Sequence, residues 1–308
     1  MIDPVDSSVS IGRVQLKNPV IAASGTFGFG REISQWYDPG QLGAIVSKGL
    51  TRLPRAGNPS PRVAETASGM LNSVGLQNPG LDRFLEDEYP NMMQFGCPVV
   101  VNVAGDFLED YVHFCRTLDQ TKVAAIELNL SCPNVAHGCM SFGADPYAVK
   151  ELVTACRQAT GKPLWVKLTP NVTSIAETAI AAEEAGADAI CLINTLLGMA
   201  IDRKQRRPIL RNNTGGLSGP AVKPVALRMV ADVYRAVRIP VIGMGGIMTG
   251  ADAIEFMIAG ATAIQVGTST LIHPTAASDI LNQMIRIAQQ EKVAHLSEYT
   301  GTLQYWKN

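Results

Sequence analysis

The sequence predicts an α/β protein folded as a (β/α)8 TIM barrel. Eight short runs rich in β-branched residues recur along the chain, and amphipathic helical patterns lie between several of them. Strands that are apolar on both faces and alternate with helices form a parallel sheet, and eight such units close into a barrel. The eight runs cover residues 20–25, 44–49, 99–105, 125–132, 164–170, 189–195, 241–246 and 263–268.

Helical spacing of apolar residues is clearest in 174–187, 222–237 and 250–261. Two of these segments end in a glycine, Gly186 and Gly260, as expected just beyond a helix C-terminus. An open, doubly wound sheet is the alternative fold. The stretch GMGGIM at 243–248 does not match the G-x-G-x-x-G dinucleotide motif of such sheets, because methionine stands where the last glycine belongs.

Length, composition and charge predict one globular domain over residues 1–308 without a nucleic-acid or membrane partner. The chain has 46% hydrophobic residues and a formal net charge of −1, and its basic cluster at 203–211 is interpreted as a solvated loop. Residues 1–12 lack the pattern of a signal peptide, and no apolar run approaches the roughly 18 residues of a membrane helix. We therefore expect a cytoplasmic protein.

The six cysteines are scattered without a C-x-x-C pair, at positions 97, 115, 132, 139, 156 and 191. This spacing argues against a zinc site, an iron–sulfur site and a disulfide framework in this chain. No metal is expected.

Polar residues stand at the carboxyl ends of the predicted strands, where barrel enzymes place their chemistry. A strand buried on both faces has no structural use for a terminal lysine or asparagine unless a partner waits there. Their recurrence predicts a ligand site at this end of the barrel. The residues are Ser24, Lys48, Asn102, Asn129 with Cys132, Lys167, Asn194 with Thr195, Gly245 with Gly246, and Gly267 with Thr268.

The residue types suggest which ligand binds. Glycines after the last two strands offer backbone N–H groups where barrels bind phosphate, and the asparagine amides suit a flat heterocycle with alternating donors and acceptors. Lys167 could form a Schiff base or hold a positive charge beside a ring that becomes anionic on reduction. Flavin mononucleotide (FMN) has such a ring and a phosphate. Lys48 offers a cation for the carboxylate of a second heterocycle.

Two long segments without clear periodicity, 51–80 and 196–222, are expected to fold as long loops covering the C-terminal face of the barrel. The first contains LNSVGLQNPG, which offers Asn72, Gly75 and Asn78 to a ligand beneath. The second ends in SGPAV, where Gly219 could approach a cofactor closely.

Motifs along the chain resemble the class 1 dihydroorotate dehydrogenases from about residue 9 to about residue 270. The form of ASGTFGFG at 23–30 is closer to the 1B type, whose catalytic subunit works with a partner, than to the fumarate-using 1A homodimer. The other matching motifs are SKG (47–49), GNPSPR (57–62), LNSVGLQNPG (71–80), NLSCPN (129–134), VKLTPN (166–171), INT (193–195), TGGLSGPA (214–221) and GMGGI (243–247).

The resemblance implies oxidation of (S)-dihydroorotate to orotate in pyrimidine biosynthesis, with Cys132 as the base that takes a proton from C5 while a hydride leaves C6 for the flavin N5. It implies substrate contacts from Lys48, Asn72, Ser73, Val74, Gly75, Leu76, Asn129, Asn134, Asn194 and Thr195. It implies FMN contacts from Ser24, Lys48, Gly49, Asn102, Asn129, Lys167, Ile193, Gly219, Gly245, Gly246, Gly267 and Thr268. His137 is a rival base, and Cys139 stands where the family has glycine.

The expected partners also follow from the resemblance. FAD and a 2Fe-2S cluster are expected only in an electron-transfer subunit, in a heterotetramer of two catalytic and two electron-transfer subunits, with a homodimer of this chain. Three alternatives stay open: a fumarate-dependent 1A enzyme, a Schiff-base aldolase using Lys167, and a barrel that binds FMN without doing chemistry. The sequence does not decide whether 285–308 packs on the barrel or meets a partner.

Overall fold

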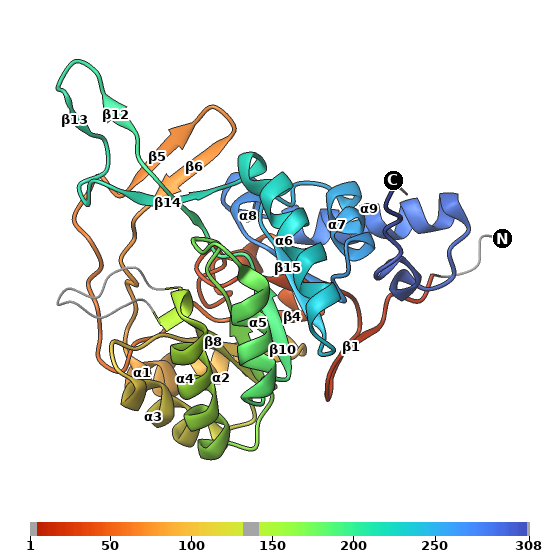
Figure 1. Cartoon of the computed structure of the whole chain (residues 1–308), viewed down its shortest axis with the longest axis horizontal. Coiled ribbons are helices and arrows are strands. Elements are labelled where there is room, and N and C mark those ends of the chain that lie inside the picture. Colours follow the sequence, from red (N-terminus) through yellow and green to blue (C-terminus); the bar gives the residue numbers. More distant parts are fainter. Residues whose placement is uncertain (1–4, 132–141, 307–308) are drawn as a thin grey trace.

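The computed structural model describes residues 5–131 and 142–306, and its eight parallel strands form a closed barrel. The predicted (β/α)8 fold is therefore confirmed (Figure 1). The barrel closes where β16 pairs with β3, with Ile264 beside Val20. In chain order its strands are β3 (Val20–Ala22), β4 (Ala44–Val46), β7 (Val99–Val103), β8 (Ala125–Asn129), β9 (Leu164–Lys167), β10 (Ala189–Leu192), β15 (Val241–Met244) and β16 (Ala263–Val266).

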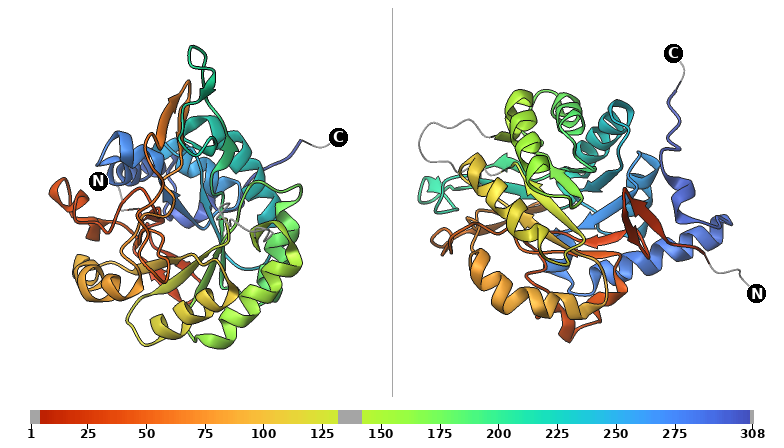
Figure 2. Two further views of the ribbon diagram at one scale, coloured as in Figure 1. Left: turned by 90° about the vertical axis from the view of Figure 1, so that its left-hand side faces the viewer. Right: turned by 90° about the horizontal axis from the view of Figure 1, so that it is seen from below.

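Helices surround these strands (Figure 2). The three predicted helical segments are all helical, and Gly186 and Gly260 follow two helix ends with φ of +96° and +123°, as expected for C-terminal glycines. The longer helices are α3 (Leu108–Asp119), α4 (Pro146–Ala159), α5 (Ile175–Glu184), α6 (Lys223–Ala236), α7 (Gly250–Ile258) and α9 (Ala276–Glu291). Short α and π turns are α1 (Leu81–Arg83), η3 (Phe84–Glu88), α2 (Tyr89–Met92) and α8 (Thr268–Ile272). Short 3-10 turns are η1 (Ile33–Gln35), η2 (Pro39–Gln41), η4 (Met93–Phe95), η5 (Phe142–Ala144) and η6 (Pro220–Val222).

Side chains alternate along each strand between two apolar layers. Val99, Val101 and Val103 of β7 pack outward with the helices, while Val100 packs inside the barrel with Trp165 and other inward residues. Each fully buried aliphatic or aromatic side chain contributes about 1.5–3 kcal/mol relative to exposure. The inward layer stops being apolar toward the carboxyl ends of the strands, which leaves that end for polar groups.

The opposite end of the barrel is closed by an N-terminal hairpin, β1 (Val9–Ile11) with β2 (Val14–Leu16). Its apolar side chains, including Ile11 and Leu16, join the cluster of residues that point into the barrel. The hairpin therefore seals the amino ends of the strands, and any ligand must enter from the carboxyl ends.

The two long segments over the carboxyl ends contain strands that the sequence analysis did not predict. They form a four-stranded antiparallel sheet in the order β11 (Leu196–Gly198), β14 (Gly215–Ser218), β6 (Gly69–Asn72) and β5 (Val63–Thr66). A further hairpin, β12 (Ile201–Asp202) with β13 (Arg207–Pro208), carries the exposed basic cluster at its turn and projects beside β5 and β6 (Figure 1). Strand β14 was not predicted because its sequence, GGLS, lacks β-branched residues. Glycine is required at position 216 because a Cβ there would lie 2.1 Å from Thr195 Oγ1.

Most of the C-terminal segment packs on the barrel. The turn η7 (Leu296–Tyr299) buries Leu296 and Tyr299 in the core, and Gly301 N donates to Met257 O of α7 at 2.9 Å. Of the segment 285–308, the part as far as Gly301 thus packs on the barrel. None of the helices in the described ranges has the length and apolar character that crossing a membrane requires.

Candidate active site

A pocket of about 650 Å³ lies between the carboxyl ends of the barrel strands and the four-stranded sheet, within the size range of small-molecule sites. Strand-end residues form its floor, and Val63, Met70 and Leu217 of the sheet line its roof. Most predicted site residues meet here: Ser24, Lys48, Gly49, Asn72, Ser73, Val74, Gly75, Leu76, Asn129, Lys167, Ile193, Asn194, Thr195, Gly245, Gly246, Gly267 and Thr268.

Three predicted residues do not line the pocket. Asn78, offered to a ligand by the sequence, is instead buried and donates to Thr51 Oγ1 at 2.7 Å. Asn102 is completely buried beneath Asn129, and Gly219 adjoins the lining residue Ser218 without lining the pocket itself. Cys132, Asn134, His137 and Cys139 lie outside the described residues. Ser131, which immediately precedes Cys132 in the chain, lines the pocket.

A buried carboxylate that sequence reasoning missed lies beneath the pocket floor. Glu127 Oε1 accepts a 2.6 Å hydrogen bond from Asn102 Nδ2, and its Oε2 accepts one of 2.5 Å from Gln265 Nε2. Glu127 and Gln265 interrupt the otherwise apolar strand segments AIEL and AIQV, a signal that could have found them. Both were overlooked because they lie before the last residue of their strands, whereas the prediction considered polar residues only at the strand ends.

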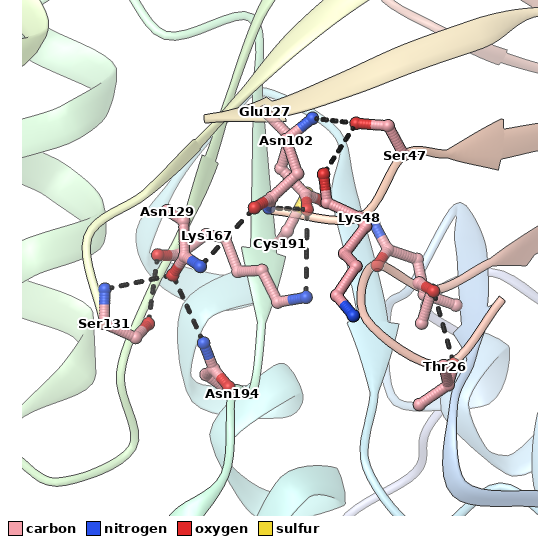
Figure 3. Close-up of polar contacts among 12 residues, drawn as sticks. Thr26, Ser47, Lys48, Asn102, Glu127, Asn129, Ser131, Lys167, Cys191 and Asn194 are labelled. Carbon is pink, nitrogen blue, oxygen red and sulfur yellow. Dashed lines mark hydrogen bonds and ion pairs between the residues drawn. The ribbon is translucent and has the colours of Figure 1, made fainter. Parts of the chain in front are cut away.

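Lys167 extends from β9 into this polar layer (Figure 3). It is 5% exposed, and its Nζ lies 3.7 Å from Glu127 Oε1, an ion pair in the barrel interior. Cys191 of β10 faces the same layer, where burial and then the charge of Glu127 raise the pKa of its thiol far above the ordinary value. That thiol is neutral and unsuited to nucleophilic chemistry.

Three asparagines form a directional series above this layer (Figure 3). Asn194 Nδ2 donates to Asn129 Oδ1 at 3.3 Å, and Asn129 Nδ2 donates to Asn102 Oδ1 at 3.5 Å. Because an ionised carboxylate only accepts hydrogen bonds, Glu127 fixes the orientation of the Asn102 amide, which in turn orients the Asn129 amide. The pocket therefore presents amides of fixed polarity.

The pocket also contains a second cation. Lys48 follows β4, and partial burial, then the nearby positive charge of Arg62, lower the pKa of its ammonium, against a smaller opposing effect of Glu32. A ligand carboxylate placed in the pocket would offset both the burial of the Lys48 ammonium and its repulsion by Arg62.

Comparison with known proteins identifies the family of this chain. Residues 7–287 match the family model described as Dihydroorotate dehydrogenase. The chain belongs to the dihydroorotate dehydrogenase family. A protein of Geobacter sulfurreducens named dihydroorotate dehydrogenase B (NAD(+)), catalytic subunit, is 55% identical over 97% of this chain and 98% of its own length.

Relatives with the same name occur in Geotalea uraniireducens, at 52% identity, and in Alkaliphilus metalliredigens, at 53% identity. Each alignment covers 97% of this chain and nearly all of the relative. The resemblance that the motifs predicted is confirmed, and membership of a dehydrogenase family makes the chain an oxidoreductase.

The glycine loops of this dihydroorotate dehydrogenase family member can be tested for fit to the phosphate of FMN. Gly245 and Gly246 have φ of +123° and +80°, and a Cβ at Gly246 would lie 2.8 Å from Gly219 O. Only glycine fits this close approach of two backbones. Beside it, Thr268 Oγ1 donates to Ser218 Oγ at 2.8 Å, at the start of α8. These loops fit a phosphate, and the amide-lined floor with Lys167 fits a polar heterocycle.

Proposed function

We propose that this chain is the catalytic subunit of an NAD-linked dihydroorotate dehydrogenase that oxidises (S)-dihydroorotate to orotate for pyrimidine biosynthesis. In this proposal residues 1–308 form a single FMN-binding domain of a cytoplasmic enzyme. The observation that carries the proposal is the convergence in one pocket of a buried lysine, an oriented series of asparagine amides and a glycine cradle. The family membership and the names of the relatives agree with it.

FMN is the proposed cofactor of this chain, and it supplies the acceptor for a hydride from the substrate. Its phosphate is held by the loops of Gly245, Gly246, Gly267 and Thr268. Lys167 and Asn129 would hold the polar edge of its ring, with Asn102 supporting Asn129 from behind the pocket wall. Ser24, Lys48, Gly49, Ile193 and Gly219 would complete the site. The hairpin closes the amino end of the barrel and the four-stranded sheet covers the pocket from above, so both limit the access of solvent to this space.

Dihydroorotate is the proposed substrate, stacked on the cofactor beneath the roof sheet. Lys48 binds its carboxylate, and Asn129, Asn194 and Thr195 bind the ring edges. The turn Asn72 to Leu76 closes over it, with Asn134 as a further contact. Asn72 Nδ2 donates to Gly216 O at 3.3 Å, which joins this turn to the roof strand β14.

Cys132 is the proposed base that takes the C5 proton. The proposal comes from the motif NLSCPN and is supported by Ser131, whose N donates to Asn129 Oδ1 at 3.2 Å within the pocket. Ser131, the residue that precedes Cys132 in the chain, therefore contacts an asparagine assigned to the substrate.

The ion pair of Lys167 argues against the aldolase alternative. A Schiff base requires a neutral amine, whereas a carboxylate 3.7 Å away favours the charged ammonium. Lys167 is better suited to hold a positive charge beside a ring that gains negative charge.

Electrons leave for NAD through a second polypeptide in this proposal. The relatives are named dihydroorotate dehydrogenase B (NAD(+)), catalytic subunit, which supports a separate partner subunit over the fumarate-using 1A alternative. In this proposal that partner carries FAD and a 2Fe-2S cluster. The proposed assembly is a heterotetramer of two catalytic and two electron-transfer subunits, built on a homodimer of this chain.

The test is anaerobic reduction of the purified chain by dihydroorotate, followed through the visible flavin absorbance. We expect rapid bleaching in the wild type and slow bleaching in Cys132→Ala with FMN still bound. A yellow protein that does not bleach would overturn the substrate, and a colourless protein that binds no added FMN would overturn the cofactor.

A further inference from the structure

Glu127 has no role in the function proposed above, yet it occupies a costly position. Of the side chains that the described residues bury, Glu127 and Lys167 alone carry a formal charge. Ala125, two residues earlier on the same inward face of β8, is apolar, so this face of the strand is not polar throughout. Because burying a carboxylate is expensive, packing alone does not explain Glu127.

The carboxylate is held rigidly from two sides of the barrel. Asn102 of β7 donates to one oxygen at 2.6 Å, and Gln265 of β16 donates to the other at 2.5 Å. Glu127 is therefore not free to follow Lys167. The 3.7 Å separation between Lys167 Nζ and Glu127 Oε1 is too long for a hydrogen bond, so the ammonium keeps its N–H groups for a ligand in the pocket.

The other described groups around Lys167 add no negative charge. Cys191, on the neighbouring strand β10, is a neutral thiol, and Asn102 and Gln265 are amides. Lys48, which lines the same pocket, adds a positive charge. Within the described residues, Glu127 is thus the counter-charge of the buried Lys167.

We propose that Glu127 is a positioning residue that pairs with Lys167 and holds its side chain at the flavin, and thereby raises the reduction potential of bound FMN. The proposal rests on the function proposed above, because FMN must occupy the pocket. A positive charge beside the ring stabilises the anionic reduced flavin. Without the carboxylate, the buried Lys167 loses the counter-charge that holds it in this position, and this stabilisation is lost.

The experiment measures the midpoint potential of FMN in the holoprotein for four forms: wild type, Glu127→Gln, Lys167→Met and the double variant. Glutamine keeps the size of glutamate and removes its charge. We expect the potential to fall in Glu127→Gln to that of Lys167→Met, with no further fall in the double variant. Glu151→Gln, an exposed change on α4, is the matched control and should leave the potential unchanged.

Two results would overturn the proposal: a wild-type potential in Glu127→Gln, or a shift of equal size when Glu127→Gln is added to Lys167→Met. The second would mean that Glu127 acts on the flavin without Lys167. If Glu127→Gln does not fold, Glu127→Asp replaces it, because aspartate keeps the charge but withdraws it by one methylene. A partial fall of the FMN potential in this variant supports the proposal, and an unchanged potential overturns it. Failure of the wild type to bind FMN would instead refute the proposed function.

Discussion

Asn194 Nδ2 donates a hydrogen bond of 3.3 Å to Asn129 Oδ1, which joins the ends of two barrel strands that are not neighbours in the sheet. Asn129 also donates to Asn102, so a single amide links the wall of the pocket to its buried floor. This relationship makes Asn129 the central member of the series.

Replacing Asn129 with alanine should therefore disturb the site more than its own contacts suggest. We expect the change to cost about 1–3 kcal/mol of substrate binding, or about a 5- to 150-fold rise in KM for dihydroorotate. Steady-state kinetics with an artificial acceptor measure it. Asn91→Ala, on α2 outside the pocket, is the control, and an equal effect of both changes would contradict the prediction.

The lowered pKa of Lys48 predicts weaker orotate binding at alkaline pH. A lysine that binds a carboxylate does so fully below its own pKa and loses the interaction as pH rises through it. Because the Lys48 pKa lies below the usual lysine value, the loss begins at a lower pH than for an exposed lysine. Flavin difference spectra with orotate, recorded across alkaline pH, measure the dissociation constant.

Lys48→Arg provides the comparison for that experiment, since a guanidinium stays charged throughout the range. The alkaline loss should disappear in the arginine variant, whatever its absolute affinity. If both proteins lose affinity along the same curve, the titrating group is in the ligand or elsewhere in the site.

Gly246→Ala should weaken FMN binding. The added Cβ meets Gly219 O and Lys223 Cβ, each at 2.8 Å, so the loop must shift away from the place assigned to the phosphate. We expect at least a tenfold rise in the FMN dissociation constant, equal to about 1.4 kcal/mol, measured by fluorescence titration of the apoprotein.

Gly96→Ala is a matched control for backbone strain. Gly96 has φ of +70°, close to the +80° of Gly246, but a Cβ there has no heavy atom within 4 Å. It should cost about 1–2 kcal/mol of folding stability and leave FMN affinity unchanged. Equal losses of FMN affinity in the two variants would show that strain alone, and not the close approach, is responsible.

Ile11→Ala should destabilise the fold without altering the site. Ile11 is fully buried in the hairpin that seals the amino end of the barrel, so its truncation leaves a cavity and costs about 2–5 kcal/mol. Urea unfolding measures this, with the exposed Gln15→Ala in the same hairpin expected to stay within about 0.5 kcal/mol of the wild type. A changed KM in Ile11→Ala would contradict the separation of the two barrel ends.

The sequence by itself determined the barrel and most of the pocket. Eight apolar runs with polar ends are a local pattern, and parallel strands bring their carboxyl ends to one rim wherever they lie in the chain. Ser24, Lys167 and Asn194 could therefore be predicted as neighbours although they are far apart in sequence.

Tertiary structure alone decided the roof sheet and the surroundings of Glu127. The glycine-rich strand β14 forms because its backbone pairs with β6 and approaches Thr195 closely, and neither contact leaves a periodic pattern of side chains. Glu127 occurs within an apolar strand. Its neighbouring strands β7 and β9 bring Asn102 and Lys167 beside it, and only barrel closure brings Gln265 to it. Contacts between distant strands depend on register and on which face each residue points to, and these are fixed when the sheet closes.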